Sequence, residues 1–230
     1  TAQSATRNLT VDTTPPNVTS LTESPADPAT YSLGARYEFN ATVWDASGIN
    51  YVLFEFNGMN YTASNLSSTR FNLTILNLAV GTYNYNWFAN DTSGNKNNTE
   101  SGTYAINRAT SIVNLTLNET ENNITINQGT AIYLNGTRIS GDAGSQIQLY
   151  KNGTLINAGI NSISNLTTFT NLGLHNITVF YPQSQNFSDS SKTLFVNVVV
   201  PADTTNPSVT SLQEPIDPSI YLSGRDYQFN

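Results

Sequence analysis

The chain has 230 residues and a formal net charge of −7, and 38% of its residues are hydrophobic, including twelve tyrosines and ten phenylalanines. This apolar content can fill the cores of one or two domains, which excludes a disordered tail. The absence of cysteine excludes disulfide scaffolds, thiolate metal sites and a cysteine nucleophile. The negative charge opposes binding to nucleic acid or anionic lipid. No apolar run approaches the roughly 18 residues of a membrane span.

The first half of the chain consists of short segments in which apolar and polar residues alternate, at 36–43, 51–56, 68–76 and 82–89. Turn sequences rich in Asp, Asn, Ser and Gly separate these segments. A period of two is typical of strands with one buried face. We therefore expect a β-sandwich over residues 12–107.

The second half repeats the pattern with different residues, and no stretch shows a helical period. The last strand is apolar on both faces, with Leu194 and Val196 on one face and Phe195 and Val199 on the other. Such a strand is covered either by its own domain or by a partner subunit. The strands expected in this half are 123–126, 131–139, 145–153, 166–170, 175–181 and 192–200.

A long internal repeat divides the chain, because residues 12–21 recur almost unchanged at 203–212, an offset of 191. That period is too long for a solenoid unit and suits two sandwich domains. The last part supplies only two of the roughly seven strands that a sandwich needs, so we expect a longer polypeptide with further modules on both sides. The expected parts are the closing strand of a preceding domain (1–11), one sandwich (12–107), a second sandwich (108–202) and the start of a third domain that repeats 12–40 (203–230).

The expected fold class is all-β, with tandem immunoglobulin-like antiparallel β-sandwich domains. The segment DTTPP at 12–16 and the stretch GTYNYNWFANDTSGN at 81–95 resemble the immunoglobulin-like or fibronectin-III-like repeats of large prokaryotic, especially archaeal, cell-surface glycoproteins. The second half, through LYKNGTLI at 149–156 and GLHNITVFYPQSQNFSDSSKTLFVNV at 173–198, is similar to a second bacterial-type immunoglobulin-like family of the same giant proteins. The resemblance implies an extracellular, cell-surface location.

Acceptor sequences for N-glycosylation, Asn-x-Ser/Thr (sequons), occur sixteen times, whereas the product of 32 Asn and 54 Ser and Thr, divided by the chain length, gives about 7.5 by chance. In eleven of them the middle residue is apolar, which in a strand places Asn and Thr on one face and the apolar residue on the other. We therefore expect covalent N-glycans on the outer surface, although an Asn- and Thr-rich strand face also generates sequons by accident. The acceptors are Asn8, Asn17, Asn40, Asn60, Asn65, Asn72, Asn90, Asn97, Asn114, Asn118, Asn123, Asn135, Asn152, Asn165, Asn176 and Asn186.

Catalytic groups are scarce in this sequence. The single histidine, His175, falls within an expected strand, and no nucleophile-elbow, zinc-protease, phosphate-loop or paired-cysteine motif occurs. None of the sixteen acidic residues lies in a sequence context that indicates a cleft for glycosidase chemistry. We therefore expect no enzyme, and no cofactor apart from calcium.

Calcium is favoured by the turns at one end of the first sandwich. Two turns are expected to lie beside the start of the first strand, which brings Asp12, Asp45 and Asp91 together in a carboxylate-rich environment that suits a hard cation. Asp and Asn in these turns also serve as ordinary turn formers, so that alternative stays open. The second sandwich offers a thinner set, Asp142 and Asp189. Further oxygens in the turns of the first sandwich come from Ser47, Asn90 and Asn95.

These features predict a structural subunit of an extracellular filament, sheath or surface layer that self-associates into a polymer, with Pro15, Pro16 and Pro207 stiffening the connections between domains. The alternative is the stalk of a cell-surface adhesin or carbohydrate-binding protein, for which exposed aromatic residues such as Trp44 and Phe88 would provide a sugar-binding face. A third alternative is a spacer in a surface-anchored hydrolase, which a catalytic domain elsewhere in the full-length sequence would identify.

Overall fold

The computed structural model describes residues 11–208 and 223–224, and these residues form seventeen strands and contain no helix that could cross a membrane. The first nine strands are β1 (Asn17–Ser24), β2 (Ala29–Thr30), β3 (Arg36–Trp44), β4 (Ile49–Phe56), β5 (Met59–Thr62), β6 (Ser64–Asn65), β7 (Arg70–Leu76), β8 (Gly81–Asp91) and β9 (Lys96–Asn107). The other eight are β10 (Ile112–Leu117), β11 (Ile124–Asn127), β12 (Ala131–Ser140), β13 (Gln146–Lys151), β14 (Thr154–Ile160), β15 (Ser162–Thr168), β16 (Gly173–Tyr181) and β17 (Ser190–Val199).

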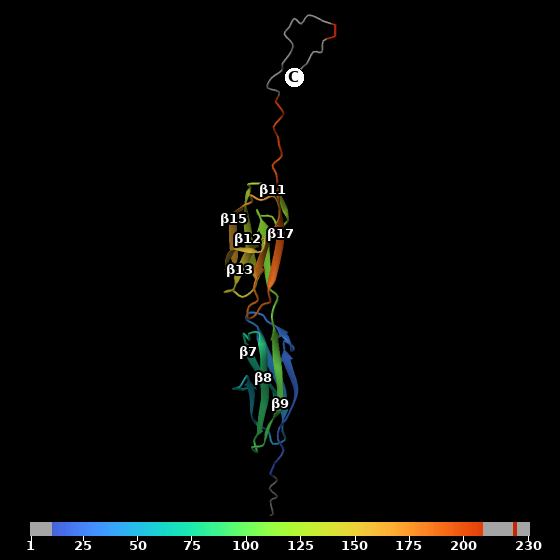
Figure 1. The fold of residues 1–230 in the computed structure, drawn as a ribbon. Coiled ribbons are helices and arrows are strands. Elements are labelled where there is room, and N and C mark those ends of the chain that lie inside the picture. Colours follow the sequence, from blue (N-terminus) through green and yellow to red (C-terminus); the bar gives the residue numbers. More distant parts are fainter. Residues whose placement is uncertain (1–10, 209–222, 225–230) are drawn as a thin grey trace, which may run out of the picture.

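The first sandwich consists of a four-stranded sheet, in the order β1-β3-β7-β6, and a five-stranded sheet, in the order β2-β9-β8-β4-β5 (Figure 1). Alternate residues of the strands point inward, as in β3, where Tyr37, Phe39 and Ala41 are buried. Aromatic rings dominate the core between the sheets. The ring centroids of Phe39 and Phe54 are 4.9 Å apart, and those of Phe54 and Trp87 are 4.7 Å apart.

The second sandwich has a three-stranded sheet, β10-β12-β15, and a five-stranded sheet, β11-β17-β16-β13-β14. Its core is mainly aliphatic rather than aromatic. Leu115, Leu134, Leu149, Ile177 and Val196 are all fully buried. Each sandwich therefore has a core of its own.

Two tandem immunoglobulin-like β-sandwiches make up the described chain, so the expected all-β fold class is confirmed. The strand pairs are antiparallel with two exceptions, because β2 pairs in parallel with β9 and β11 pairs in parallel with β17. In each sandwich the chain leaves its first strand, crosses to the opposite sheet and joins the edge beside the last strand. A strand that crosses between sheets in this way keeps its direction and meets the last strand in parallel.

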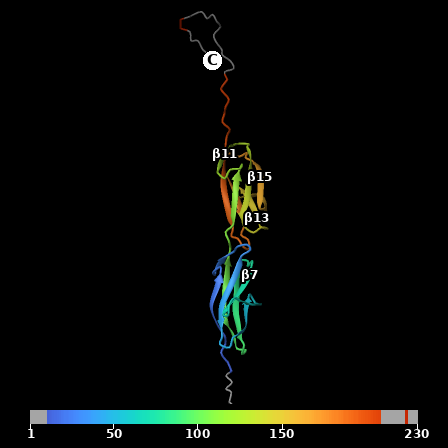
Figure 2. The same cartoon turned by 180° about the vertical axis from the view of Figure 1, so that it is seen from behind.

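The two sandwiches lie end to end, and the chain reaches the first at one end of the rod and leaves the second at the opposite end (Figures 1 and 2). At their junction the Tyr31 and Phe187 rings meet edge to face, with centroids 5.6 Å apart. The backbone of Val80 forms two hydrogen bonds across the junction. Its N–H donates to Asn186 Oδ1 at 3.2 Å, and its carbonyl accepts from Gln185 Nε2 at 2.9 Å.

The apolar strand near the end of the second sandwich, β17, lies between β11 and β16. Leu194, Val196 and Val198 enter the core, whereas the side chain of Phe195 on the other face is 36% exposed and Val200 beyond the strand is 65% exposed. The domain itself therefore covers one face of this strand. Two expected parts lie mostly outside the described residues. They are the strand expected within 1–11, of which only the last residue is described, and the third domain expected at 203–230.

Candidate metal site and glycan acceptors

Three turns bring carboxylates together at the amino-terminal end of the first sandwich. Asp12 precedes β1, Asp45 lies in the turn between β3 and β4, and Asp91 ends β8. Asp45 and Asp91 are buried and Asp12 is half-buried. One carboxylate oxygen of each residue lies within 4.8 Å of those of the other two, so the structure brings together all three residues that the sequence singled out.

Two of these aspartates also stabilise their own turns. The Asp45 Oδ1 atom accepts hydrogen bonds from the Ser47 N–H and hydroxyl, both at 2.7 Å. The Asp91 Oδ1 atom accepts from the backbone N–H groups of Ser93 and Asn95 at 2.9 and 2.8 Å. The turn-forming role that the sequence left open is therefore present, and it fixes where these carboxylates point.

Asp12 is tied to the same cluster through Asn95. The Asn95 amide group donates to Asp91 Oδ2 at 2.8 Å and to the backbone carbonyl of Asp12 at 3.2 Å. The Asp12 Oδ1 atom accepts from the Thr14 N–H at 2.9 Å, but its Oδ2 atom is buried and has no hydrogen-bond partner among the described residues. A buried carboxylate oxygen without a donor is the kind of atom that a bound cation would satisfy.

Local hydrogen bonds favour the ionised forms of Asp12 and Asp91. The hydrogen bond from the Thr14 backbone is the main cause that holds the pKa of Asp12 below its ordinary value. Burial raises the pKa of Asp91, but the hydrogen bonds from Asn95 and Ser93 outweigh burial and lower the pKa overall. Both groups are therefore anionic at neutral pH, in the form that a metal ion requires.

The arrangement fits a calcium ion. Because Ca²⁺–oxygen distances are about 2.3–2.6 Å, two oxygens on one ion lie no more than about 5 Å apart, and the three carboxylates meet that limit. Asp12, Asp45 and Asp91 would hold the ion. Asn90 does not join them, because strand alternation places it on the opposite face of β8 from Asp91.

The corresponding end of the second sandwich holds no such group of three acidic side chains among the residues that the structure describes. Asp142 instead accepts hydrogen bonds from the backbone N–H and the side-chain amide of Asn186, at 3.3 and 3.2 Å. Asp189 is exposed. The junction between the two sandwiches thus uses an aspartate–asparagine contact where the first sandwich has a carboxylate cluster.

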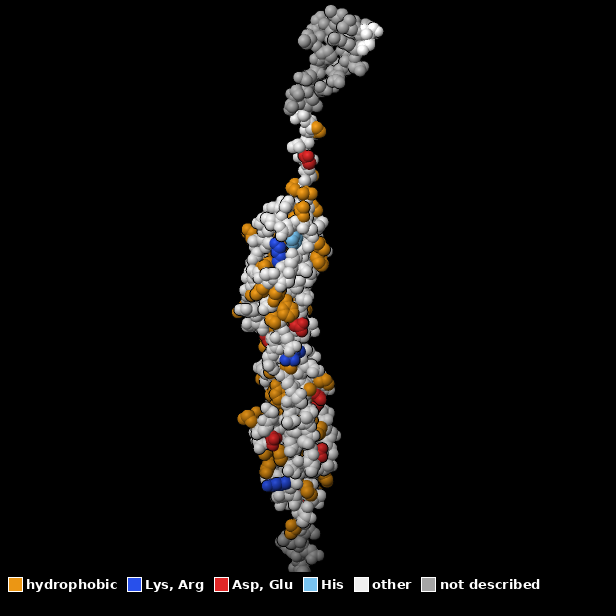
Figure 3. Space-filling view, in the orientation of Figure 1, with side chains coloured by type: hydrophobic (Ala, Val, Ile, Leu, Met, Phe, Trp, Pro, Cys, Tyr) orange, Lys and Arg blue, Asp and Glu red, His pale blue; other side chains and the backbone are white. Residues whose placement is uncertain are grey.

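The sequon asparagines fall into three groups by exposure, and Asn8 lies outside the described residues. Exposed acceptors are Asn17, Asn60, Asn65, Asn118, Asn123, Asn152 and Asn176. Half-buried acceptors are Asn40, Asn72, Asn97, Asn114, Asn135, Asn165 and Asn186, and the buried one is Asn90. On the face of the molecule drawn in Figure 3, hydrophobic side chains form small groups and charged side chains are few and scattered. Whether any of these asparagines carries a glycan stays a prediction.

The expectation that sequon asparagines face solvent is wrong at Asn90, which is 8% exposed. Asn90 lies on the outer face of β8, as the alternation predicted, but its neighbours across the sheet are Tyr51 of β4 and Lys96 of β9. Two long side chains beside a short one cover it. Its Oδ1 atom is buried and has no hydrogen-bond partner within the described chain.

The middle residues of the sequons follow the expected pattern only in part. Val18, Ala41, Leu115 and Ile177 are buried, as the alternation predicted. Three others are exposed at sheet edges, because one lies on the edge strand β5, one lies on the edge strand β15, and one directly follows the edge strand β6. These exposed middle residues are Tyr61, Leu66 and Leu166.

Two sequon asparagines contact each other directly. Asn40 of β3 and Asn72 of β7 are paired across the sheet, and the Asn72 amide donates to Asn40 Oδ1 at 3.0 Å. Thr74, the third residue of the second sequon, donates to Asn72 Oδ1 at 3.3 Å. This contact arises from strand register, which the sequence spacing of the two sequons does not reveal.

His175 is a packed strand residue in the structure, with 6% of its surface exposed. Its Nε2 atom lies 2.9 Å from the Asn171 carbonyl, and its Nδ1 atom lies 3.0 Å from the Asn152 amide nitrogen. The ring also packs edge-on against Phe169. Both nitrogens are thus occupied by structural contacts.

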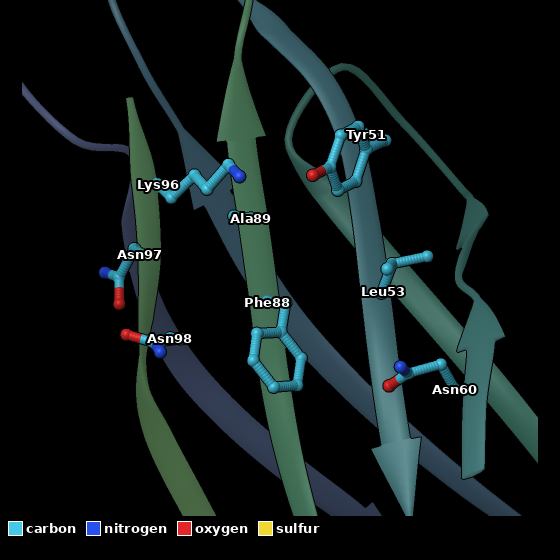
Figure 4. A pocket seen from close by; sticks show the side chains of 8 residues that line it. All are labelled: Tyr51, Leu53, Asn60, Phe88, Ala89, Lys96, Asn97 and Asn98. Carbon is cyan, nitrogen blue, oxygen red and sulfur yellow. The ribbon is translucent and has the colours of Figure 1, made fainter. Parts of the chain in front are cut away.

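A groove crosses the outer face of the five-stranded sheet of the first sandwich (Figure 4). It includes Phe88, one of the two aromatic residues singled out from the sequence, whereas Trp44 is 58% exposed and lies elsewhere. Sequence reasoning missed Tyr51 and singled out Asn60 only as a glycan acceptor, and both residues line the same groove. The alternation of β4 indicates that Tyr51 points outward, but only the pairing of β4 with β8 and β5 places these side chains together.

No family model and no curated protein matches the chain. Solved structures with a similar fold include the fibronectin(III)-like modules of CbhA from Clostridium thermocellum, at 15% identity and a TM-score of 0.34, covering 85% of this chain and 100% of that one. The D00-D0 domain of intimin is 15% identical with a TM-score of 0.31, and the alignment covers 79% of this chain and 98% of that one.

A third similar structure belongs to a 1.5-MDa bacterial ice-binding adhesin, at 14% identity and a TM-score of 0.31, covering 81% of this chain and 67% of that one. Similarity at this level carries no inference about activity or partners. The assignment to tandem immunoglobulin-like sandwiches rests on the sheets themselves.

Proposed function

We propose that this chain is a structural segment of an extracellular filament, sheath or surface layer, built from glycosylated immunoglobulin-like modules in series. The observation that carries the proposal is the end-to-end placement of two separate cores, with the chain entering and leaving at opposite ends of the rod (Figure 1). A module of this kind adds length with every repeat. The role is mechanical and needs no catalytic group.

The repeated linker supports a series of such modules. The Asp-Thr-Thr sequence that precedes the first sandwich recurs at 203–205 after the second. Asp203 Oδ1 accepts from the Thr205 N–H at 2.9 Å, as Asp12 Oδ1 does from the Thr14 N–H. The same local turn therefore leads into the first sandwich and out of the second.

Calcium is part of the proposal at the amino-terminal end of the first sandwich. Asp12 belongs to the linker, whereas Asp45 and Asp91 belong to the body of the domain. An ion held by all three would fix the direction in which the linker leaves the domain. This would stiffen the connection to whatever segment precedes it.

Electron microscopy of the native, full-length protein tests the proposed function. We expect an ordered polymer whose repeat along its axis contains two sandwich-sized densities. Glycopeptide mass spectrometry of the same material is expected to find N-glycans on the exposed acceptors. A protein that is monomeric in its native setting and carries no glycan would contradict the proposal.

The adhesin or carbohydrate-binding alternative is favoured by one observation, the groove beside Phe88 with its aromatic and amide lining. In that case the sandwiches would be a stalk that presents a recognition surface. Binding of free oligosaccharides to the unglycosylated chain, together with single unpolymerised rods in the microscope, would support this alternative over the filament.

A further inference from the structure

The groove on the outer face of the first sandwich has the composition of a small-molecule site rather than of a plain polar sheet surface. It has a volume of about 320 Å³ and lies over Ala89 of β8 (Figure 4). Tyr51 and Leu53 of β4 and Phe88 of β8 supply its apolar part, and Asn98 of β9 supplies an amide. Apolar and aromatic walls with a few polar groups are typical of ligand sites.

The register of the strands explains why these side chains meet. Leu53 is paired with Phe88 on one side and with Thr62 on the other, so the three form a row across the outer face. Asn60 lies two residues from Thr62 on β5 and therefore belongs to the adjacent row. The Phe88 ring and the Asn60 side chain thus share one face of the sheet.

Two buried acceptors lie on either side of Phe88 on the same face of β8, outside the lining of the groove. The Oδ1 atoms of Asn86 and Asn90, two residues before and after Phe88, are buried and have no hydrogen-bond partner within the described chain. Asn90 is more than nine-tenths buried, and its cover comes from the exposed side chains Tyr51 and Lys96 across the sheet. Buried acceptors without donors are costly, and a ligand rich in hydroxyl groups would satisfy them once those side chains move aside.

A sugar has this combination of an apolar ring face and hydroxyl donors. Its ring would stack on Phe88 and Leu53, while its hydroxyls would donate to the amide oxygens beside the ring. The Lys96 amine and the Tyr51 hydroxyl point toward each other over β8 in Figure 4 and add donors at one end of the groove.

The chain itself offers a source of that sugar at the lip of the groove. Asn60 begins the sequon Asn-Tyr-Thr and is exposed. Its side chain forms no hydrogen bond to the described residues and points toward β4 in Figure 4. Asn97, the other acceptor at the rim, turns away and donates to the Pro16 carbonyl at 2.9 Å. Asn60 is therefore the acceptor from which a glycan would start inside the groove.

The separation is short enough for the first sugars to reach the ring. Asn60 and Phe88 lie two strand spacings apart and one two-residue step along the sheet, which puts their Cα atoms about 12 Å apart. The asparagine side chain and one or two sugar rings cover that distance. A tether of this length holds the sugar near the groove at an effective concentration in the millimolar range.

We propose that the groove lined by Tyr51, Leu53 and Phe88 seats the first sugars of an N-linked glycan carried on Asn60, with Phe88 as the stacking platform. The inference rests on the glycosylated exterior in the proposed function. The seated glycan covers the central strands of the outer face and links β5, at the edge, to β8 in the middle of the sheet.

A double-mutant cycle in the 230-residue chain, produced in a host that attaches N-glycans, tests this inference. Asn60→Gln and Thr62→Ala each remove the glycan, and Phe88→Ala removes the platform. We expect loss of the glycan to lower the melting temperature of the first sandwich by roughly 4 °C or more in the parent chain. In the Phe88→Ala background the same loss is expected to have little effect.

Two controls make the cycle specific. Asn118→Gln removes an exposed acceptor in the second sandwich, and its effect should not depend on Phe88. If the Phe88→Ala variant does not fold, Phe88→Leu takes its place, because leucine keeps an apolar side chain. This variant should still weaken the coupling to Asn60. Additive effects of the Asn60 and Phe88 substitutions in the glycosylated chain would overturn the proposal.

The source of the sugar is decided by two further measurements. Released glycan added to the unglycosylated chain should shift the NMR signals of Leu53 only at millimolar concentrations. Tight binding of free glycan would show that the groove binds external sugars, and it would overturn the proposal that the glycan on Asn60 occupies it. A glycopeptide map with glycans on other acceptors but not on Asn60 would refute this inference and leave the proposed function standing. Coupling between Asn60 and Phe88 in a protein that forms no polymer would support this inference and refute the proposed function.

Discussion

The substitution Asp12→Asn provides a direct test of the calcium site. It keeps the size of the side chain and one oxygen that can accept from the Thr14 N–H. The amide nitrogen then takes the place of the buried, unpartnered Oδ2 atom. Without calcium, the wild-type chain holds three carboxylates with oxygens within 4.8 Å of one another. Repulsion among these carboxylates opposes the stabilisation that the hydrogen bonds give the ionised Asp12, so we expect Asp12→Asn, which keeps the Thr14 contact, to change the melting temperature little in the presence of a chelator.

Calcium should separate the melting temperatures of the wild type and the variant. A ligand that binds only the folded state stabilises it by about 2.7 kcal/mol when its concentration is about 100 times its dissociation constant. For a domain of about 60–100 residues, each kcal/mol shifts the melting temperature by roughly 4–8 °C, so the first sandwich should melt about 10 °C or more above its value in chelator. Asp12→Asn removes one of three anionic ligands and should lose most of that increase.

Differential scanning calorimetry with and without calcium measures both effects, and the second sandwich serves as an internal reference. Asp203→Asn is the matched control, because Asp203 makes the same contact with Thr205 but belongs to no group of three acidic side chains among the described residues. Its calcium response should equal that of the wild type. A wild-type melting temperature that does not respond to calcium, or an equal response in Asp12→Asn, would refute the reasoning.

Three further predictions concern stability. The pKa values of Asp12 and Asp91 are lowered from 3.8 in the folded state. Their contribution to the free energy of unfolding is therefore present above pH 3.8 and is lost as the pH falls toward the lower folded values. Chemical denaturation between pH 2 and 6 in chelator should show this loss. Burial raises the pKa of Tyr104 to about 12, so the folded state should lose stability as pH rises from 10 toward 12, and this loss, measured by urea titration, should be smaller in Tyr104→Phe. Gly136→Ala should destabilise the second sandwich by about 1–3 kcal/mol, because a Cβ atom there would lie 2.8 Å from Val179 Cγ2, whereas Gly144→Ala, with open space around it, should change little in the same urea titration.

Much of the fold follows from local pattern. The alternation at 82–89 predicts a strand with an aromatic inner face, and β8 has that face, with Tyr85 and Trp87 buried. The absence of helical periods predicts an all-β chain, because a strand buries every second residue whichever strand it pairs with. The convergence of Asp12, Asp45 and Asp91 also follows from chain order, since turns at one end of a sandwich lie close together whatever their sequences.

Cross-strand register and edge position were decided only by the tertiary structure. The alternation along β8 predicts that Asn90 is an exposed acceptor, yet Tyr51 and Lys96 flank it across the sheet and bury it. Leu166 has the alternation of a core residue, yet it is 59% exposed because β15 lies at a sheet edge. The groove beside Phe88 likewise depends on β4 and β5 being its neighbours. A sequence pattern determines which face of a strand a residue occupies, whereas packing of the other strands determines what lies next to it.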